Sequence, residues 1–509
     1  MKTQFLVAIA LLGGQTGVPA AQYSLFSFDD HTIPFRHNLF VTLNQPVKYN
    51  GNPVVPRGPE GTPDAVRAQF YGSVVRVGSK WRMWYAAMAH AGVVGSRATG
   101  FHIAYAESDD GLKWRKPNLG LTEFNGNTNN NLVGLTPKLD YELMEPLASF
   151  VLYEPDERDA SRRYKMLVYG RYYDRSDTGH RRPHATVYPY FSADGLRWQL
   201  ARHAPKGPVF DETEAPFTTK HVFEIGGLYK FGGIYYVAGQ QIWRDSWMPG
   251  GAPAGRTMMV HWSGDFIDWS QDSVFAFQRY GYRSVNENLE EAHEPAGVWN
   301  RGNVLLATYG LWHGAANFTS ERRMDLGLLV SNDGLHFREP VPDFVFIPAG
   351  MDSEWDRHGL IHGQGYENVG DKTYIYYGTW DLSSDREAGG AIGVAMLPRD
   401  RFGSISTRLP GYGQFTTIPI AGRYDPRTLR LNVDGLGAQA TLRVELIDSA
   451  GRPLAGYSGT DAAVVRESGL DVKVSWPRGG AVNRDYRLRI RFDGEEVHNI
   501  KFFAAYLGE

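Results

Sequence analysis

A short motif that recurs along the chain is the sequence feature that most constrains the fold. It reads Ser-x-Asp-x-x-x-aromatic, and each copy follows a predicted β-strand. Its Asp, usually followed by Gly, suits a tight turn. Successive copies are roughly 70 residues apart, and a repeat of this length in an all-β pattern is typical of a β-propeller. The copies are Ser108–Trp114, Ser192–Trp198, Ser263–Trp269 and Ser331–Phe337, with a degraded fifth copy at Asp400–Phe402.

The same order of predicted strands surrounds each copy. Short apolar or alternating runs end at Gly, Asn or Asp, and no long amphipathic helix is indicated. Asp-Gly is also the commonest hairpin signal, so a set of unrelated hairpins is the alternative. Because the copies stay in phase with the strands, we predict five propeller blades, at 71–108, 148–192, 221–263, 294–331 and 365–397.

The chain of 509 residues is too long for one ordinary core, so a second domain is expected. Residues 409–422 hold two Pro and three Gly and read as a linker. Beyond them, alternating runs in 423–509 predict a β-sandwich. The propeller is expected to span 21–408, with a strand at 26–28 closing the ring against the last blade. The predicted fold class is therefore all-β, a five-bladed β-propeller followed by a C-terminal β-sandwich.

The first 20 residues read as a signal peptide. Lys2 precedes an apolar run that is too short to span a bilayer, and small residues precede Ala21. The alternative is a buried N-terminal strand. The chain has no cysteine, which excludes disulfides, thiol catalysis and a lipid anchor on cysteine. A net charge of −3 does not indicate a nucleic-acid or membrane partner. We expect a periplasmic or extracellular protein.

The blade motif, Gly51–Val54 before the first blade and the Tyr-rich strand Tyr374–Gly378 carry a resemblance to a known group. The chain resembles the furanosidase-type glycoside hydrolases, chiefly family 32, in which a propeller precedes a β-sandwich. Its propeller also resembles families 43, 117 and 130. The invertase signature Asn-Asp-Pro-Asn-Gly is absent, and the nearest match, Tyr49–Pro53, has no Asp. The resemblance thus implies this architecture and hydrolysis of glycosidic bonds, but not invertase specificity.

Hydrolysis of a glycosidic bond needs two carboxyl groups facing each other, one of them protonated. In a propeller these are expected where the innermost strands begin, around a central funnel. Residues 290–295 of the fourth blade hold three Glu and His293 directly before an apolar strand. We expect Glu294 to be the general acid, because a neighbouring Glu291 would raise its pKa. The alternative is a solvated acidic loop.

Three further carboxylates are candidates for the catalytic pair. Glu224 interrupts an apolar run of the third blade, and it faces either the funnel or the outer surface of an alternating strand. The resemblance places an acid in the third blade, which favours Glu224 as a rival to Glu294. Asp64, before the first blade, corresponds by position to the family's nucleophile or base; it is equally a turn or cap residue after Pro63. Asp140 offers a carboxylate ahead of the second blade.

Substrate-binding groups are expected beside these carboxylates. Trp355 can stack on a sugar ring, and Arg357 and His362 can donate hydrogen bonds to hydroxyl or carboxylate groups. His362 can alternatively act as an acid. We expect Trp312, His293 and Glu291 to contact the substrate as well. No cofactor is required, and no zinc-type spacing is present. A structural Ca²⁺ in the channel is compatible with the sequence.

The sequence therefore predicts an exported glycoside hydrolase that acts on an oligosaccharide or polysaccharide. A non-catalytic propeller that binds glycans or proteins is the alternative, since the fold does not fix the function. Phosphorylase or lyase chemistry on the same fold is also open.

Overall fold

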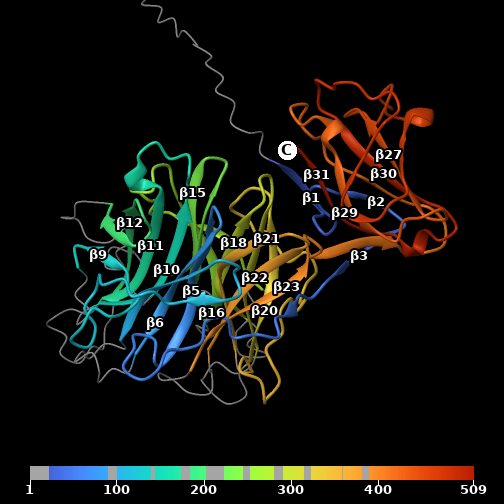
Figure 1. Ribbon diagram of the computed structural model, residues 1–509. Coiled ribbons are helices and arrows are strands. Elements are labelled where there is room, and N and C mark those ends of the chain that lie inside the picture. The colour runs from blue at the N-terminus through green and yellow to red at the C-terminus, as the bar shows by residue number, and fades with distance from the viewer. Residues whose placement is uncertain are drawn as a thin grey trace, which may run out of the picture.

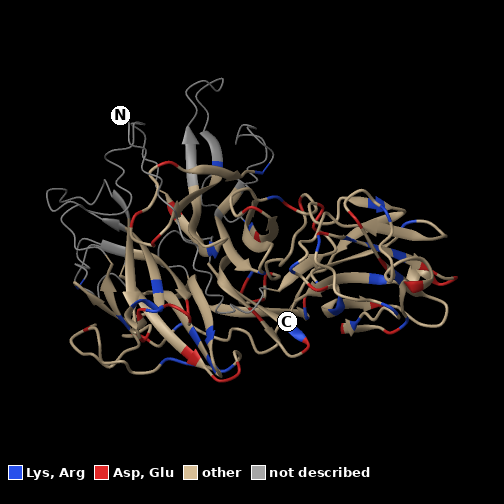
Figure 2. Ribbon diagram, turned by 90° about the horizontal axis from the view of Figure 1, so that it is seen from above, with Lys and Arg blue, Asp and Glu red and all other residues tan. Residues whose placement is uncertain are grey.

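The computed structural model describes residues 22–508 except 90–99, 139–143, 173–183, 202–222, 245–252, 280–290, 314–322, 358 and 381–388. The described elements are β-strands and short 3-10 turns, which confirms the all-β class. They form a propeller and a β-sandwich that lie side by side (Figures 1 and 2). No helix among the described residues is long and apolar enough to cross a membrane. The 3-10 turns are η1 (Ala160–Arg162), η4 (Pro426–Thr428), η5 (Gly459–Asp461) and η6 (Val497–Asn499).

Five mainly antiparallel blades form the propeller, in the predicted order along the chain, and a parallel pairing of β21 with β5 joins blades V and I into one eight-stranded sheet. Blade I consists of β5 (Arg67–Val77), β6 (Lys80–Met88), β7 (Phe101–Ser108) and β8 (Trp114–Arg115). Blade II consists of β10 (Met144–Tyr153), β11 (Tyr164–Tyr172), β12 (His184–Ser192) and β13 (Arg197–Leu200), with β9 (Gly134–Thr136) parallel to β13. Blade III consists of β14 (Glu224–Phe231), β15 (Ile234–Arg244), β16 (Pro253–Ser263) and β17 (Val274–Phe277). Blade IV consists of β18 (Glu291–Asn300), β19 (Leu305–His313) and β20 (Arg323–Ser331). Blade V consists of β21 (Leu360–Val369), β22 (Lys372–Thr379), β23 (Ile392–Pro398) and β4 (Val47–Lys48).

The first strand of each blade is the innermost. Strands β5, β10, β14, β18 and β21 each contact the next in this order, and β21 returns to β5, so they close a ring. Clusters of buried apolar and aromatic side chains fill the spaces between neighbouring blades. The ring thereby leaves few exposed sheet edges.

The repeated motif forms the same turn in all four full copies. In the first, the Ser108 hydroxyl accepts from the Gly111 N–H (3.0 Å), and the Asp110 carboxylate accepts from the N–H groups of Leu112 and Lys113 (2.8 and 2.7 Å). The equivalent bonds recur at Asp194, Asp265 and Asp333. The predicted turn is therefore confirmed, and the Asp side chain is what closes it.

The turn also links neighbouring blades, which the sequence did not indicate. The Gly111 carbonyl accepts from the hydroxyl of Tyr376 in blade V (2.7 Å), and the Gly195 carbonyl accepts from the indole of Trp84 in blade I (2.8 Å). The Gly334 carbonyl accepts in the same way from Tyr229 of blade III (2.6 Å). Each of these turns is thus held by an aromatic donor from the preceding blade.

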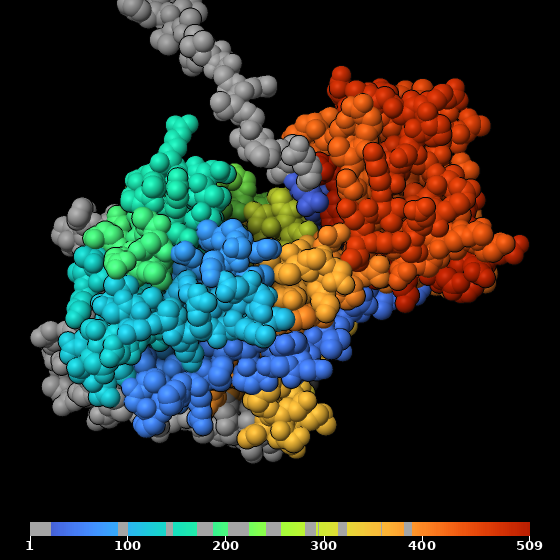
Figure 3. All heavy atoms as spheres, viewed as in Figure 1, coloured from blue at the N-terminus to red at the C-terminus, as the bar shows by residue number. Residues whose placement is uncertain are grey.

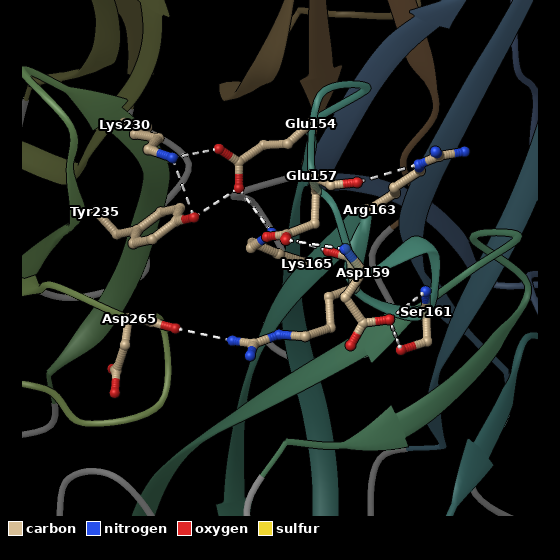
Figure 4. Close-up of polar contacts among 10 residues, drawn as sticks. Glu154, Glu157, Asp159, Ser161, Arg163, Lys165, Lys230, Tyr235 and Asp265 are labelled. Atoms are coloured by element: carbon tan, nitrogen blue, oxygen red, sulfur yellow. Dashed lines mark hydrogen bonds and ion pairs between the residues drawn. The ribbon is translucent and has the colours of Figure 1, made fainter. Parts of the chain in front are cut away.

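Blades II and III are joined by a partly buried ion-pair network (Figure 4). Lys165 of β11 is buried and lies 2.7 Å from the Glu154 carboxylate and 3.0 Å from that of Glu157. Glu154 in turn accepts from Lys230 (2.5 Å) and from the Tyr235 hydroxyl (2.6 Å) of blade III. Because every charge has a partner, burial of the Lys165 ammonium is compensated.

The β-sandwich takes strands from both ends of the chain (Figure 3). One sheet has the order β29 (Gly469–Lys473), β26 (Arg430–Asp434), β31 (Lys501–Leu507), β24 (Gly403–Thr407) and β3 (Leu39–Leu43), with β1 (Tyr23–Phe26) also paired to β31. The other has the order β2 (Phe35–His37), β25 (Gly413–Thr416), β30 (Arg487–Asp493), β27 (Thr441–Ile447) and β28 (Ala463–Val465). A single apolar core lies between them.

These pairings differ from the expected boundaries of 408 and 423. The sandwich already includes β24 and β25, and the segment at 26–28, expected to close the ring, adjoins β1, whose partner is β31 of the sandwich. Blade V is instead completed on its outer side by β4, which pairs with β23 at Lys48↔Ala395. An N-terminal segment therefore does complete the last blade, but it lies about 20 residues further along the chain.

Glycines let the inner strands approach closely at the centre of the ring. A Cβ atom on Gly297 would overlap the carbonyl oxygen of Gly363, and one on Gly227 would overlap that of Ala296. We expect Gly297→Ala to destabilise the propeller by about 3 kcal/mol, because backbone atoms cannot move aside as a flexible side chain can. Urea unfolding followed by Trp fluorescence measures this. Gly264→Ala, in open space, is the control, and an equal shift in both variants would contradict the packing argument.

Candidate functional site

All five inner strands are interrupted by a register shift near their first residues. The shifts lie at Gln69/Ser73, Pro146/Ala148, Ile225/Gly227, His293/Gly297 and His362/Tyr366. Such bulges bend a strand and change the direction in which its side chains point. The residues just before the bulges therefore belong to one end of the ring, and they include four of the candidates predicted from the sequence, Glu224, Glu291, His293 and His362.

Side chains of blade V cross the centre of the ring and bond to blade III. The Nε2 atom of His362 lies 3.1 Å from the carbonyl oxygen of Gly226, and the Gln364 side-chain oxygen accepts from the Leu228 N–H (2.9 Å). The two β14 groups in these bonds, the Gly226 carbonyl and the Leu228 N–H, lie at or beside the bulge of β14. These bonds close the centre of the ring below the candidate site.

His362 is suited to a positioning role. It is 1% exposed, and burial lowers its pKa to about 4, with the Gly226 carbonyl acting in the opposite direction. At neutral pH the ring is uncharged, so Nε2 carries the proton that is donated to Gly226. Because Gly226 is two residues after Glu224, this bond fixes the bulge that directs the Glu224 side chain.

Glu224 is the partly exposed one of the two predicted carboxylates at this end of the ring whose side chains are described, the other being Asp64. It is half-buried as the first residue of β14. Its neighbour across the ladder is Gln240 of β15, whose amide donates to the Glu224 carboxylate at 2.7 Å. Gln240 is buried, so it restricts the carboxylate to one orientation while leaving part of it accessible.

Five side chains from four blades form a continuous stack at the same end of the ring. The guanidinium carbon of Arg256 lies 5.1 Å from the centroid of Trp312, and the Trp312 ring lies 5.0 Å from that of His293. The His293 ring lies 6.1 Å from Trp380, over which the Arg67 guanidinium lies at 5.4 Å. Trp312, His293 and Arg67 are buried within the stack, so Arg256 and Trp380 are its two members with exposed surface, and Trp312, expected to contact the substrate, does not present an open face.

Trp355 and Arg357 adjoin the same region. They line a pocket of about 280 Å³ whose wall includes Trp380, a member of the stack. The Trp355 ring is held against Tyr377 at 5.9 Å, whereas Arg357 is exposed. The structure therefore brings these two fifth-blade candidates close to Trp312 and His293.

Asp64 has a different environment. It is 1% exposed, accepts from the Tyr85 hydroxyl at 2.8 Å and forms an ion pair with Lys116. Asp64 and Lys116 line a pocket of about 520 Å³ together with Trp114 and several Asn side chains that include Asn131. The Asp64 carboxylate is thus engaged by two donors of blade I.

Three carboxylate candidates cannot be described. Glu291 and Glu294 lie on β18, with Glu291 opposite Trp312 and Glu294 inside the bulge, but their side chains lie outside the described residues. Asp140 also lies outside them. Their predicted roles stay predictions.

The sequence analysis did not single out Arg67, Gln240, Arg256 or Trp380. They belong to three different blades. Trp380 alone could have been noticed, because it directly follows the Tyr-rich strand of blade V. Among the described residues, no group of three His, Asp or Glu side chains could hold a metal ion, and the Ca²⁺ hypothesis is not tested by this finding.

Comparison with known proteins gives similarity to solved structures only. No family model and no curated protein matches the chain. A glycoside hydrolase structure from Parabacteroides distasonis is 15% identical, covers 70% of this chain and 97% of its own, and has a TM-score of 0.44. A thermostable family-43 glycoside hydrolase is 13% identical (67% and 93% covered, TM-score 0.41). The GH32 β-fructofuranosidase BmSUC1 of Bombyx mori is 11% identical (92% and 95% covered, TM-score 0.39). At these values the activity has to be argued from the site residues themselves.

Proposed function

We propose that this protein is a glycoside hydrolase that cleaves an oligosaccharide or polysaccharide at the bulged end of the inner strands. The observation that carries the proposal is the position of Glu224, a partly exposed carboxylate held by Gln240, at the same end of the ring as the stack that runs from Arg256 to Arg67. The closed centre of the ring gives such a site a floor. From the N-terminal segment 1–20 we further propose export to the periplasm or the cell exterior.

In the proposed reaction Glu294 protonates the leaving oxygen, and Glu224 acts as nucleophile or as base for water. The transition state resembles an oxocarbenium ion, and an ionised carboxylate stabilises its positive charge. Trp380, which is half-buried, offers a face for the sugar ring. Trp312 and Arg67 are buried, and they hold His293 and Trp380 in place. Retention or inversion of configuration depends on the separation of the two carboxyl groups.

The remaining candidates receive supporting roles in this proposal. His293, Glu291, Trp355 and Arg357 contact the substrate, and Asp140 adds a polar group from the segment before blade II. His362 positions Glu224 through the bulge, because a neutral imidazole with a pKa of about 4 is a poor proton donor at neutral pH. Asp64 holds Lys116 and Tyr85 in place. No cofactor takes part.

The test is to incubate the purified protein with furanosidic, pyranosidic and uronic-acid oligosaccharides and to read the products by mass. We expect the wild type to release a sugar from at least one of them, and the Glu224→Gln/Glu294→Gln variant to release none. Products that are phosphorylated only in phosphate buffer would indicate a phosphorylase, and unsaturated products a lyase. Binding without any release would instead favour a glycan-binding propeller.

A further inference from the structure

One face of the β-sandwich carries an unusual concentration of arginines. In the sheet β2-β25-β30-β27-β28, alternate residues of β27 and β30 point into the core, and the others point outward. The outward residues of β30 are Arg487, Arg489, Arg491 and Asp493. Figure 2 shows blue positions along the strands of this domain. The face is hollowed, with a volume of about 760 Å³. Its lining is Gln414, Thr441, Arg443, Glu445, Val464, Arg466, Arg489, Arg491 and Asp493.

The register aligns these side chains in a row across all five strands. His37 is opposite Gln414, and Gln414 is opposite Arg491. Arg491 is opposite Arg443, which is opposite Val464. The row therefore runs perpendicular to the strands, at roughly 4.8 Å per step, which is the spacing of strands in a sheet.

The central pair of the row consists of two like charges. Arg443 and Arg491 face each other directly, and like charges in such positions destabilise a sheet. Arg443 donates to the carbonyl oxygen of Gly459 (3.0 Å), while Arg491 bonds to Asp493 (2.6 Å) at the edge of the row. An anion placed between the two guanidinium groups would relieve their repulsion.

Acidic and aromatic groups flank the arginines. Glu445 binds Arg489 (2.7 Å), and Asp493 lies on the other side of the row. Phe35 of β2 is 59% exposed, and the Arg491 guanidinium carbon lies 4.3 Å from the ring centroid of Tyr412, which is 45% exposed. The face thus combines hydrogen-bond donors for anions, acceptors for hydroxyl groups and exposed aromatic rings.

We propose that this face binds an acidic glycan, a chain that contains uronic acids, laid across the strands. Guanidinium groups pair with carboxylates in bidentate fashion, the acidic side chains accept from sugar hydroxyls, and Phe35 stacks on a ring. Nucleic acid fits less well, because its dense phosphate charge would meet Glu445 and Asp493. This site lies on a different domain from the proposed catalytic residues and does not depend on them.

The test measures binding of an oligogalacturonide and of a neutral galactan by calorimetry, in the Glu224→Gln/Glu294→Gln background so that hydrolysis does not interfere. We expect binding of the oligogalacturonide that weakens at least tenfold in Arg443→Gln/Arg491→Gln. Arg430→Gln is the matched control, because Arg430 is an exposed arginine on the other sheet. It should bind as tightly as its parent.

Three outcomes would overturn the proposal. They are absence of oligogalacturonide binding, equal binding in the double arginine variant, and binding of the neutral galactan or of single-stranded DNA at least as tight as that of the oligogalacturonide. Near-UV circular dichroism of the variant shows whether a loss of binding comes from misfolding. Arg443→Lys/Arg491→Lys keeps both positive charges but loses the bidentate hydrogen bonding of the guanidinium groups, so in that variant we expect intermediate affinity.

Discussion

Glu224→Gln and Glu294→Gln are each expected to lower kcat/KM by about 10³-fold on the substrate found in the product screen. A positioned general acid or base contributes about 10²- to 10⁴-fold to a reaction of this kind. Gln is nearly isosteric with Glu, and in Glu224→Gln the bond from Gln240 can still reach the side-chain oxygen. The loss would therefore report on the missing charge and proton rather than on misfolding.

The leaving group separates the two roles. If Glu294 is the acid, Glu294→Gln should lose much less activity on an aryl glycoside, whose phenolate leaves without protonation, than on a natural linkage. Glu224→Gln should lose activity on both. Glu123→Gln is the control and should behave as wild type, because Glu123 is an exposed carboxylate in the segment between β8 and β9. Full activity in Glu224→Gln together with loss in Asp64→Asn would contradict our assignment and place Asp64 in the pair.

The sequence was most informative about the repeat. The Asp of each motif closes a turn with its own side chain, a local interaction within four residues, so that four copies sufficed to predict the blades. The bonds from Trp84, Tyr229 and Tyr376 to these turns could not be predicted, since each donor comes from another blade. Local chemistry was readable, and the contacts between blades were not.

The partners of the N-terminal strands show a second limit. The segment at 26–28 and the partner of β1 are both apolar, and their pattern predicts a buried strand without specifying the sheet. The strand that does complete blade V, β4, has only two residues, too few to show an alternation of apolar and polar side chains. Pairing of this kind is decided by packing between domains, which leaves little trace in a single sequence.

The candidate site was only partly predicted, because part of it depends on contacts between blades. Glu224, His293 and His362 stand just before bulges of inner strands, near the strand starts at which the sequence predicts the site residues. Arg67 and Trp380 are far apart in sequence, and only the closure of blade V onto blade I brings them together.

Asp400, the Asp of the degraded fifth motif, joins the propeller to the sandwich. Its carboxylate is 2% exposed and pairs through both oxygens with Arg301 of the turn between β18 and β19. It also accepts from the Tyr506 hydroxyl of β31 (2.8 Å) and from the Asn368 amide of β21 (3.1 Å). One carboxylate thereby links two blades and the second domain.

Asp400→Ala is expected to destabilise the protein by about 3–5 kcal/mol, because it leaves the buried Arg301 guanidinium without its charge partner. Arg301→Met combined with Asp400→Ala should recover part of the loss, since no unpaired charge then remains. Urea unfolding measures both variants. Asp371→Ala, an exposed Asp near the same turn, is the control. If Asp400→Ala lowered the free energy of unfolding as little as the control does, the Asp400–Arg301 pair would contribute nothing to stability.

The pH dependence gives an independent check on the same pair. Burial alone raises the pKa of Asp400, but the charge and hydrogen bonds of Arg301, with the bonds from Tyr506 and Asn368, outweigh it and hold the pKa below its usual value. A carboxylate with a lowered pKa stabilises the folded state above its unfolded pKa of about 3.9 and loses this contribution as the pH falls through the folded value. The stability difference between wild type and Asp400→Asn should therefore be largest at neutral pH and shrink below about pH 4. A difference that stayed constant down to pH 3 would show that Asp400 acts through hydrogen bonding and shape rather than through its charge.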